Sequence, residues 1–188
     1  MELPGSNQSV SLCRMGRDSS AGVYSLVQFP SVFVREGAWQ LDQAEDYFLL
    51  EGSLDFAGFS TEAGDFVHIP ENYVRTNTKS QHGALALARF PAPPQWCEAK
   101  IQRHAKPPVQ VTNPVNETRQ HTVWGSGVLL ESSCKTEIWW LADSMSVRSL
   151  DKAEAIFSVN NCQLTIAPQE SEASSGDSPI LLFLKSVR

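Results

Sequence analysis

Histidine and cysteine side chains are the first candidates for chemistry in this chain, because both can bind a transition metal. The four cysteines are widely spaced and form no Cys-x-x-Cys pair, so we expect reduced, mostly buried thiols. No spacing places two of the four histidines on one face of one element. His68 lies in the strand-like stretch GDFVHIP, where two roles stay open: a satisfied residue of a strand or pocket, and a functional residue. We expect the other three in surface loops: His82, His104 and His121.

Other signatures of catalysis or of macromolecular binding are weak. The glycines at 125–127 lack the lysine of a phosphate loop, and no Gly-x-Ser-x-Gly elbow is present. The net charge of −6, without a run of Lys or Arg, argues against nucleic-acid binding. The longest purely apolar run, 180–184, is too short to span a bilayer, and the first residues do not resemble a secretory signal. We therefore expect a cytoplasmic protein that binds neither nucleic acid nor membrane.

Alternation of apolar and polar residues at period two dominates the chain, and no window shows three turns of helical periodicity. Gly, Pro and Asn separate the alternating stretches, which is typical of an antiparallel barrel or sandwich. The predicted strands are 22–29, 31–36, 46–56, 64–69, 84–90, 127–132, 136–147, 155–159, 162–166 and 180–187.

Two polar segments interrupt this pattern. Residues 90–116 hold six of the eleven prolines and are predicted to connect two halves of the chain, whereas 167–179 is predicted to be a mobile loop. The halves resemble each other, because a shift of 91 residues places 46–56 on 137–147 and 59–66 on 150–157, with apolar residues facing apolar residues. We interpret this as an internal duplication with halves at 1–98 and 99–188.

Four residues carry a resemblance to a known family. Glu45 and Gly52 are separated by six residues, and Gly64 and Pro70 by five. With these spacings the chain resembles the cupin superfamily, particularly the duplicated cupins similar to the metal-binding domain of ChrR-type anti-sigma factors. The resemblance covers 22–90 well and 118–187 weakly. It implies an all-β fold, a double-stranded β-helix (cupin or jelly-roll) barrel, with two cupin-like halves in one chain.

The metal ligands of that family are mostly replaced here. With four residues between the family's His-x-His pair and its Glu, the pair falls on Ala38 and Gln40, and the histidine of the second motif falls on Arg75. Only Glu45 keeps the type of a metal ligand, because an arginine is a permanent cation without a lone pair to share. The resemblance therefore predicts no metal and no cofactor, although relocated ligands stay an alternative.

The substitutions leave Glu45 and Arg75 facing each other in the barrel, where a guanidinium can neutralise a carboxylate with bidentate geometry. Two interpretations stay open. The pair is a structural plug, or Arg75 recognises a carboxylate or other small anion that is walled by Trp39 and Gln40, with His68 as a further candidate ligand-binding residue.

The function that we predict is a metal-free, non-catalytic module that binds a small anionic ligand or senses it. We also expect a homodimer, because small barrels leave edge strands and apolar faces that pairing would cover. The alternatives are a metal-dependent dioxygenase or lyase with relocated ligands, a metal-independent isomerase, and a barrel that serves only as a structural scaffold.

Overall fold

The computed structural model describes residues 1–17 and 22–99, together with the strand segments 110–112, 127–131, 136–141, 153–158, 163–166 and 180–185. Every regular element in these ranges is a β-strand, as the alternation predicts. The chain divides into two compact units. Unit 1 comprises Met1–Met15 and Gly22–Thr112, and unit 2 comprises Gly16–Ala21 and Asn113–Arg188. The described part of the chain contains no helix that is long and apolar enough to cross a membrane.

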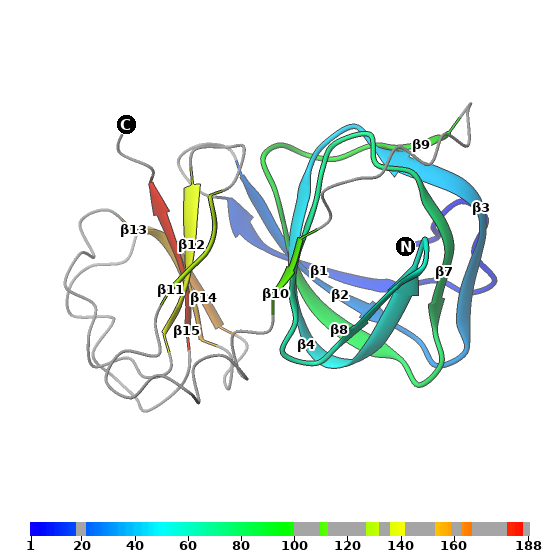
Figure 1. The fold of residues 1–188 in the computed structure, drawn as a ribbon, viewed down its shortest axis with the longest axis horizontal. Helices are drawn as coiled ribbons and strands as arrows, with labels where there is room; N and C mark the ends of the chain where they lie inside the picture. The colour runs from blue at the N-terminus through cyan, green and yellow to red at the C-terminus, as the bar shows by residue number, and fades with distance from the viewer. Residues whose placement is uncertain are drawn as a thin grey trace. The chain divides into compact units, whose positions relative to one another are not determined.

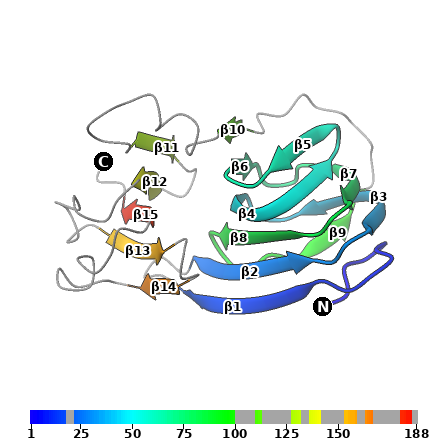
Figure 2. The same ribbon diagram turned by 90° about the horizontal axis from the view of Figure 1, so that it is seen from below.

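Unit 1 is built on a ten-stranded antiparallel sheet with the order β1-β2-β8-β4-β7-β3-β9, to which β5, β6 and β10 are attached. The sheet curls round on itself (Figure 1), and Figure 2 shows β1, β2, β8 and β4 as successive strands. The strands are β1 (Ser11–Arg17), β2 (Val23–Phe29), β3 (Phe33–Leu41), β4 (Glu45–Phe56), β5 (Phe59–Glu62), β6 (Phe66–Ile69), β7 (Arg75–Ser80), β8 (Ala84–Phe90), β9 (Trp96–Glu98) and β10 (Gln110–Thr112).

The long strand β4 organises unit 1, because it pairs with four neighbours. Its first part pairs with β6 and β8, and its end pairs with β5 and contacts β7. Successive side chains of a strand point to opposite faces. Glu45, Tyr47 and Leu49 therefore face one side, while Asp46 and Phe48 face the other.

The inner side of the curled sheet holds the apolar core of unit 1. Tyr47 and Leu49 join this core, so the side of β4 that carries Glu45 is the inner one. The buried members of the core are Leu41, Tyr47, Leu49, Leu54, Phe56, Val67, Ile69, Ala84, Ala86, Ala88 and Phe90.

Gly52, the glycine at the end of the first motif, has a backbone reason for its identity. It lies in β4 at a φ of +75°, and a Cβ there would stand 2.0 Å from the carbonyl oxygen of Gly83. An L side chain would therefore be strained and would also clash with a neighbouring backbone. The close approach of the β4 and β8 ends requires glycine at this position.

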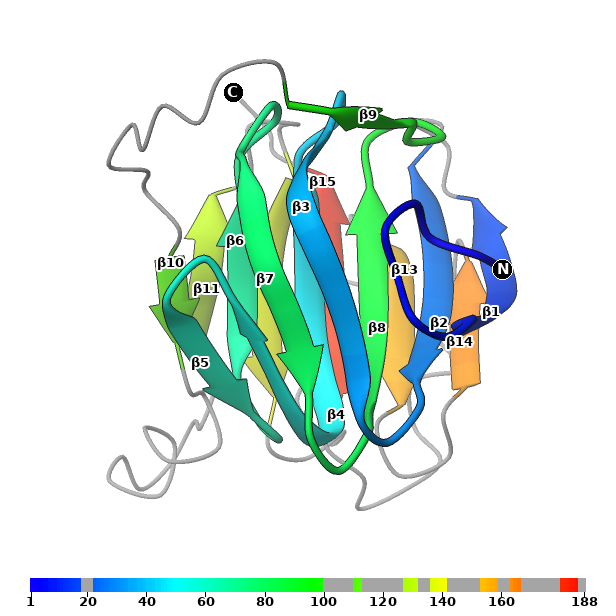
Figure 3. The ribbon, with the colours of Figure 1, turned by 90° about the vertical axis from the view of Figure 1, so that its right-hand side faces the viewer.

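Several strands of unit 1 were not predicted. β7 (RTNTKS) has no apolar residue and forms by pairing with β3, which lies beside it in Figure 3. The Pro-rich connection contributes β9, which pairs with β3, and β10, which pairs with β6. β1 and β5 were not predicted either. The loop predicted at 167–179 lies outside the described residues.

The first ten residues form a segment pinned along β3. The Asn7 amide donates to the carbonyl oxygen of Val34 at 2.9 Å, and the Glu36 amide donates to that of Gly5 at 2.9 Å. Leu3, Val10 and Phe33 form a small buried cluster, against which Trp96 packs. The segment therefore lies beside β3 and close to Trp96 of β9.

Unit 2 contains a five-stranded antiparallel sheet with the order β11-β12-β15-β13-β14. Its strands are β11 (Gly127–Glu131), β12 (Thr136–Leu141), β13 (Ala153–Ser158), β14 (Gln163–Ile166) and β15 (Ile180–Lys185). The internal duplication, with halves at 1–98 and 99–188, stays a prediction.

Candidate functional site

Glu45 and Arg75 form a buried ion pair inside the curled sheet of unit 1. Glu45 opens β4 and is in register with Ile69 of the core, and Arg75 opens β7. Arg75 Nη1 donates to Glu45 Oε2, and the two residues are 8% and 9% exposed. The predicted contact between these side chains is confirmed. Any role of the pair toward a ligand goes beyond this geometry.

Trp96 brings a second arginine to this pair. In β9, Trp96 is in register with Leu41, so its indole lies on the inner face. The guanidinium carbon of Arg35 stands 3.7 Å from the centroid of the Trp96 ring, and that of Arg75 stands 5.0 Å from the same centroid. Both distances are within the range of cation–π attraction. The indole of Trp96 therefore makes a cation–π contact with each of the two guanidinium groups.

Arg35 is 2% exposed, which places it among the most deeply buried side chains of the described residues. Its Nε donates to the carbonyl oxygen of Pro4 at 2.8 Å, and its guanidinium carbon lies 4.9 Å from the ring centroid of Trp39. No carboxylate among the described residues forms an ion pair with it. Arg35 is therefore a buried cation that is held by a backbone carbonyl and by aromatic rings.

Two fully buried nitrogens of this cluster have no hydrogen-bond partner within the described residues: Arg35 Nη2 and Arg75 Nε. Leaving a buried donor unsatisfied costs about 1–3 kcal/mol, and more for a charged group. Arg35, Arg75 and Glu45 together carry a formal charge of +1. Hydrogen-bond acceptors with a negative charge would complement both features of the cluster.

Burial changes the ionisation of the groups around the cluster. Desolvation, followed by the nearby cation of Arg75, lowers the pKa of Arg35 from its ordinary value to about 10, while the Glu45 carboxylate acts in the opposite direction. Arg35 is still charged at neutral pH. Desolvation also raises the pKa of the Tyr47 and Tyr73 hydroxyls, so both phenols are neutral there.

The inward residues of β3 differ by one position from those expected from the family motif. Trp39 is in register with Arg75, and Leu41 belongs to the core. By alternation, Ala38 and Gln40 then face away from Arg75. The motif allows three or four residues before Glu45, and three fits this geometry. Trp39 and Leu41 thus stand where the family has its histidine pair.

This arrangement does not suit a transition metal. An indole ring and a leucine offer no metal-binding atom, and the Arg75 guanidinium would repel a cation from the remaining carboxylate of Glu45. Gln40, predicted to wall the site, instead directs its amide to Asn72 Oδ1 at 3.4 Å. Of the predicted residues, the structure thus brings together Glu45, Arg75 and Trp39.

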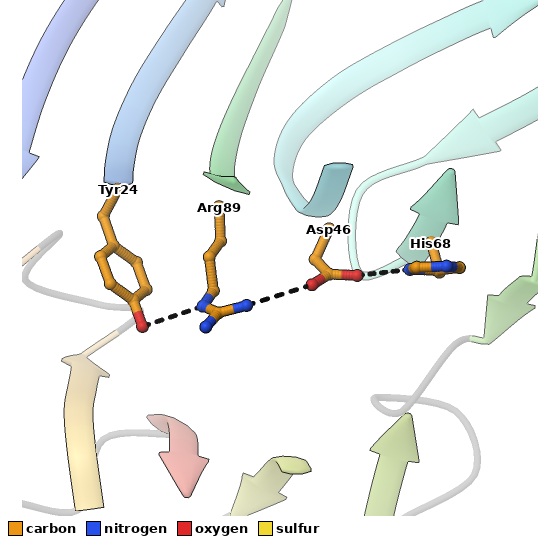
Figure 4. Close-up of polar contacts among 4 residues, drawn as sticks. All are labelled: Tyr24, Asp46, His68 and Arg89. Carbon is orange, nitrogen blue, oxygen red and sulfur yellow. Dashed lines mark hydrogen bonds and ion pairs between the residues drawn. The ribbon is translucent and has the colours of Figure 1, made fainter. Parts of the chain in front are cut away.

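His68 lies on the opposite face of the sheet, in a row of polar side chains that crosses four strands (Figure 4). Its Nδ1 is 2.6 Å from Asp46 Oδ1, and Asp46 Oδ2 is 3.6 Å from Arg89 Nη1. Arg89 Nε donates to the Tyr24 hydroxyl at 3.1 Å. The four residues are direct partners in the register of β6, β4, β8 and β2.

The register explains why these residues form a row. Direct partners on adjacent strands point to the same face, so each contact links two strands. Arg89 and Asp46 are 1% and 4% exposed, and each of these buried charges is compensated by the opposite charge of the other. We interpret the row as a device that fixes the pairing of β2, β8, β4 and β6. Within the described residues, no group of three or more His, Cys, Asp or Glu side chains is arranged to hold a metal.

The signals for Arg35 and Trp96, which sequence reasoning missed, are modest. Arg35 follows the buried Phe33 by two residues, so strand alternation places both on the inner face. Trp96 is an aromatic residue in the Pro-rich connection, and the sequence around it does not predict the short strand β9.

Comparison with known proteins gives the fold. No family model matches the chain, and no curated protein matches it. Among solved structures, a cupin 2 conserved barrel domain protein from Leptotrichia buccalis is 12% identical, with a TM-score of 0.55 over 94% of this chain and 89% of that one. A candidate dioxygenase from Nostoc punctiforme is 10% identical, with a TM-score of 0.56 over 98% and 77%.

The protein Ylba from E. coli is a third neighbour, 9% identical with a TM-score of 0.50 over 99% of this chain and 79% of that one. At these identities the likeness concerns the fold and not the activity. The all-β prediction and the resemblance to cupins therefore hold at the level of the fold. The chain has the β-barrel fold of the cupin, or RmlC-like, proteins.

Proposed function

We propose that unit 1 is a binding module that takes up a small anion at Arg35 and Arg75, without a metal or another cofactor. One observation carries the proposal: two buried guanidinium groups share the indole of Trp96, and in the described part of the chain one carboxylate, that of Glu45, forms an ion pair with them, at Arg75. An anion would supply acceptors for the two unsatisfied N–H groups and would neutralise the remaining charge.

Arg35 favours this proposal over a purely structural plug. A purely structural ion pair needs only Glu45 and Arg75. Arg35 adds a second buried cation, and its burial costs desolvation free energy. Its pKa is lower in the folded chain than in the unfolded chain, so below about pH 10 the charged form opposes folding. This penalty is fully present below the folded pKa, and it declines as the pH rises from the folded pKa toward the higher unfolded pKa. Perturbed groups of this kind are concentrated at binding sites.

Arg35→Met is the direct test, because methionine fills similar space without the charge. We expect saturating anion to raise the Tm of the wild type by about 5 °C and to leave the Tm of the variant unchanged. Without anion the variant should lose no more than about 1 kcal/mol, since replacing a buried charge by an apolar side chain is often neutral or stabilising. Formate, propionate, malonate and sulfate are compared with chloride at matched ionic strength by differential scanning fluorimetry.

Arg14→Met is the matched control, because Arg14 is exposed on β1. This variant should respond to anions as the wild type does, which separates the site from general salt effects. An Arg35→Met protein that keeps the full anion response would contradict the proposed site.

A dioxygenase activity, which the name of the Nostoc neighbour suggests for that protein, is not what we propose for this chain. Trp39, Leu41 and Arg75 stand at the positions of the family's metal-binding histidines, and they cannot coordinate a metal. We carry four further expectations as proposals: a second cupin-like half within the chain, a relation to ChrR-type regulators, a homodimer, and a cytoplasmic location.

A further inference from the structure

We infer that the ligand is a monocarboxylate and that Glu45 is the residue that sets the charge the site accepts. This inference rests on the proposed function, because it assumes that an anion binds at Arg35 and Arg75. It goes further by naming the chemical class of the anion and the residue that selects it.

The buried cluster carries one net positive charge. Arg35 and Arg75 contribute two positive charges, and the carboxylate of Glu45 removes one through its ion pair with Arg75. A monoanion therefore brings the cluster to neutrality. A dianion would leave an excess negative charge among residues that are less than 10% exposed, where uncompensated charge is costly.

The cluster also offers hydrogen-bond donors from both arginines. Arg35 Nη2 and Arg75 Nε are the two fully buried nitrogens of the cluster that lack a hydrogen-bond partner within the described residues. A carboxylate has two oxygens, so it can accept one hydrogen bond from each arginine. The second carboxylate of a dicarboxylate would add a negative charge that the cluster does not balance.

The role of Glu45 follows from both arguments. Its carboxylate takes the Nη1 donor of Arg75 and cancels one guanidinium charge. Glu45→Gln would raise the charge of the cluster to +2 while keeping a side chain of nearly the same shape. The variant should then accept a dianion in place of a monoanion.

Propionate and malonate are the matched probes, because they have the same three-carbon skeleton with one and two carboxylates. The Kd of each is measured by titration calorimetry at pH 7.5 with the full chain. We expect the wild type to bind propionate at least tenfold more tightly than malonate, and Glu45→Gln to reverse this order. Glu51→Gln removes a charge at an exposed position of β4 and should keep the wild-type preference.

The outcomes separate this inference from the proposed function. Equal or tighter binding of malonate to the wild type would overturn the monocarboxylate class and leave anion binding intact. Binding of neither probe, nor of formate or sulfate, would overturn both. If Glu45→Gln does not fold, the preference of the wild type alone still decides the class of ligand. A folded Glu45→Gln that still prefers propionate would remove Glu45 as the selecting residue.

Discussion

Arg75→Leu should lower the free energy of unfolding by about 3–5 kcal/mol, the range found when one partner of a buried ion pair is removed. Glu45 is 9% exposed, so the variant leaves a carboxylate inside unit 1 without its guanidinium. The double variant Glu45→Gln with Arg75→Leu should lose much less, about 1–2 kcal/mol, because neither charge is then left alone. Urea unfolding followed by circular dichroism measures all three proteins.

The comparison of single and double variants is the informative quantity. A double variant that is more stable than Arg75→Leu shows that the two residues are coupled. If both variants lose the same stability, Glu45 and Arg75 do not form the buried pair described above. Neither variant should bind propionate, since each lacks an arginine of the site.

Asp46→Ala should also destabilise the protein strongly, by about 3 kcal/mol or more. The Asp46 carboxylate lies between His68 and Arg89, and Arg89 is 1% exposed. Removing it takes a carboxylate from a buried guanidinium and breaks the polar row in the middle. Its urea midpoint is compared with that of Asp55→Ala, an exposed aspartate of the same strand that should change stability by less than about 0.5 kcal/mol.

The binding readout of Asp46→Ala distinguishes the two faces of the sheet. Asp46 points away from Glu45, so the folded variant should bind propionate with the affinity of the wild type. A large loss of affinity at unchanged stability would mean that the polar row belongs to the binding site. That result would also restore His68 as a ligand-binding residue.

The sequence predicts the paired charges better than it predicts their surroundings. The motif spacing predicts that Arg75 lies opposite Glu45. The glycines and the proline of the motif, Gly52, Gly64 and Pro70, set the turns and so the direction of the strands that carry the two side chains. The inward side of β3 is misplaced by one residue, since the motif tolerates two spacings and a shift by one exchanges the faces of a strand. The register with Arg75 and the ring contact with Arg35 show that Trp39 is inward.

Trp96 and β7 show what local sequence cannot supply. The polar stretch of β7 has little strand character of its own and forms because β3 and β4 offer it partners. Trp96 reaches the two arginines because β9 adds to the edge of β3, a contact between residues far apart in the chain. Tertiary pairing, and not local propensity, completes the candidate site.

The central claim is that unit 1 binds a small anion through its own arginines and without a metal. Calorimetric titration of chelator-treated wild-type protein with propionate tests it most directly. Elemental analysis must first show fewer than about 0.1 transition-metal ions for each chain, so that a bound metal cannot account for one-to-one binding of propionate. The account predicts saturable binding of one propionate to each chain. Absence of binding by the metal-free protein, with binding restored by added iron, zinc or manganese, would contradict it.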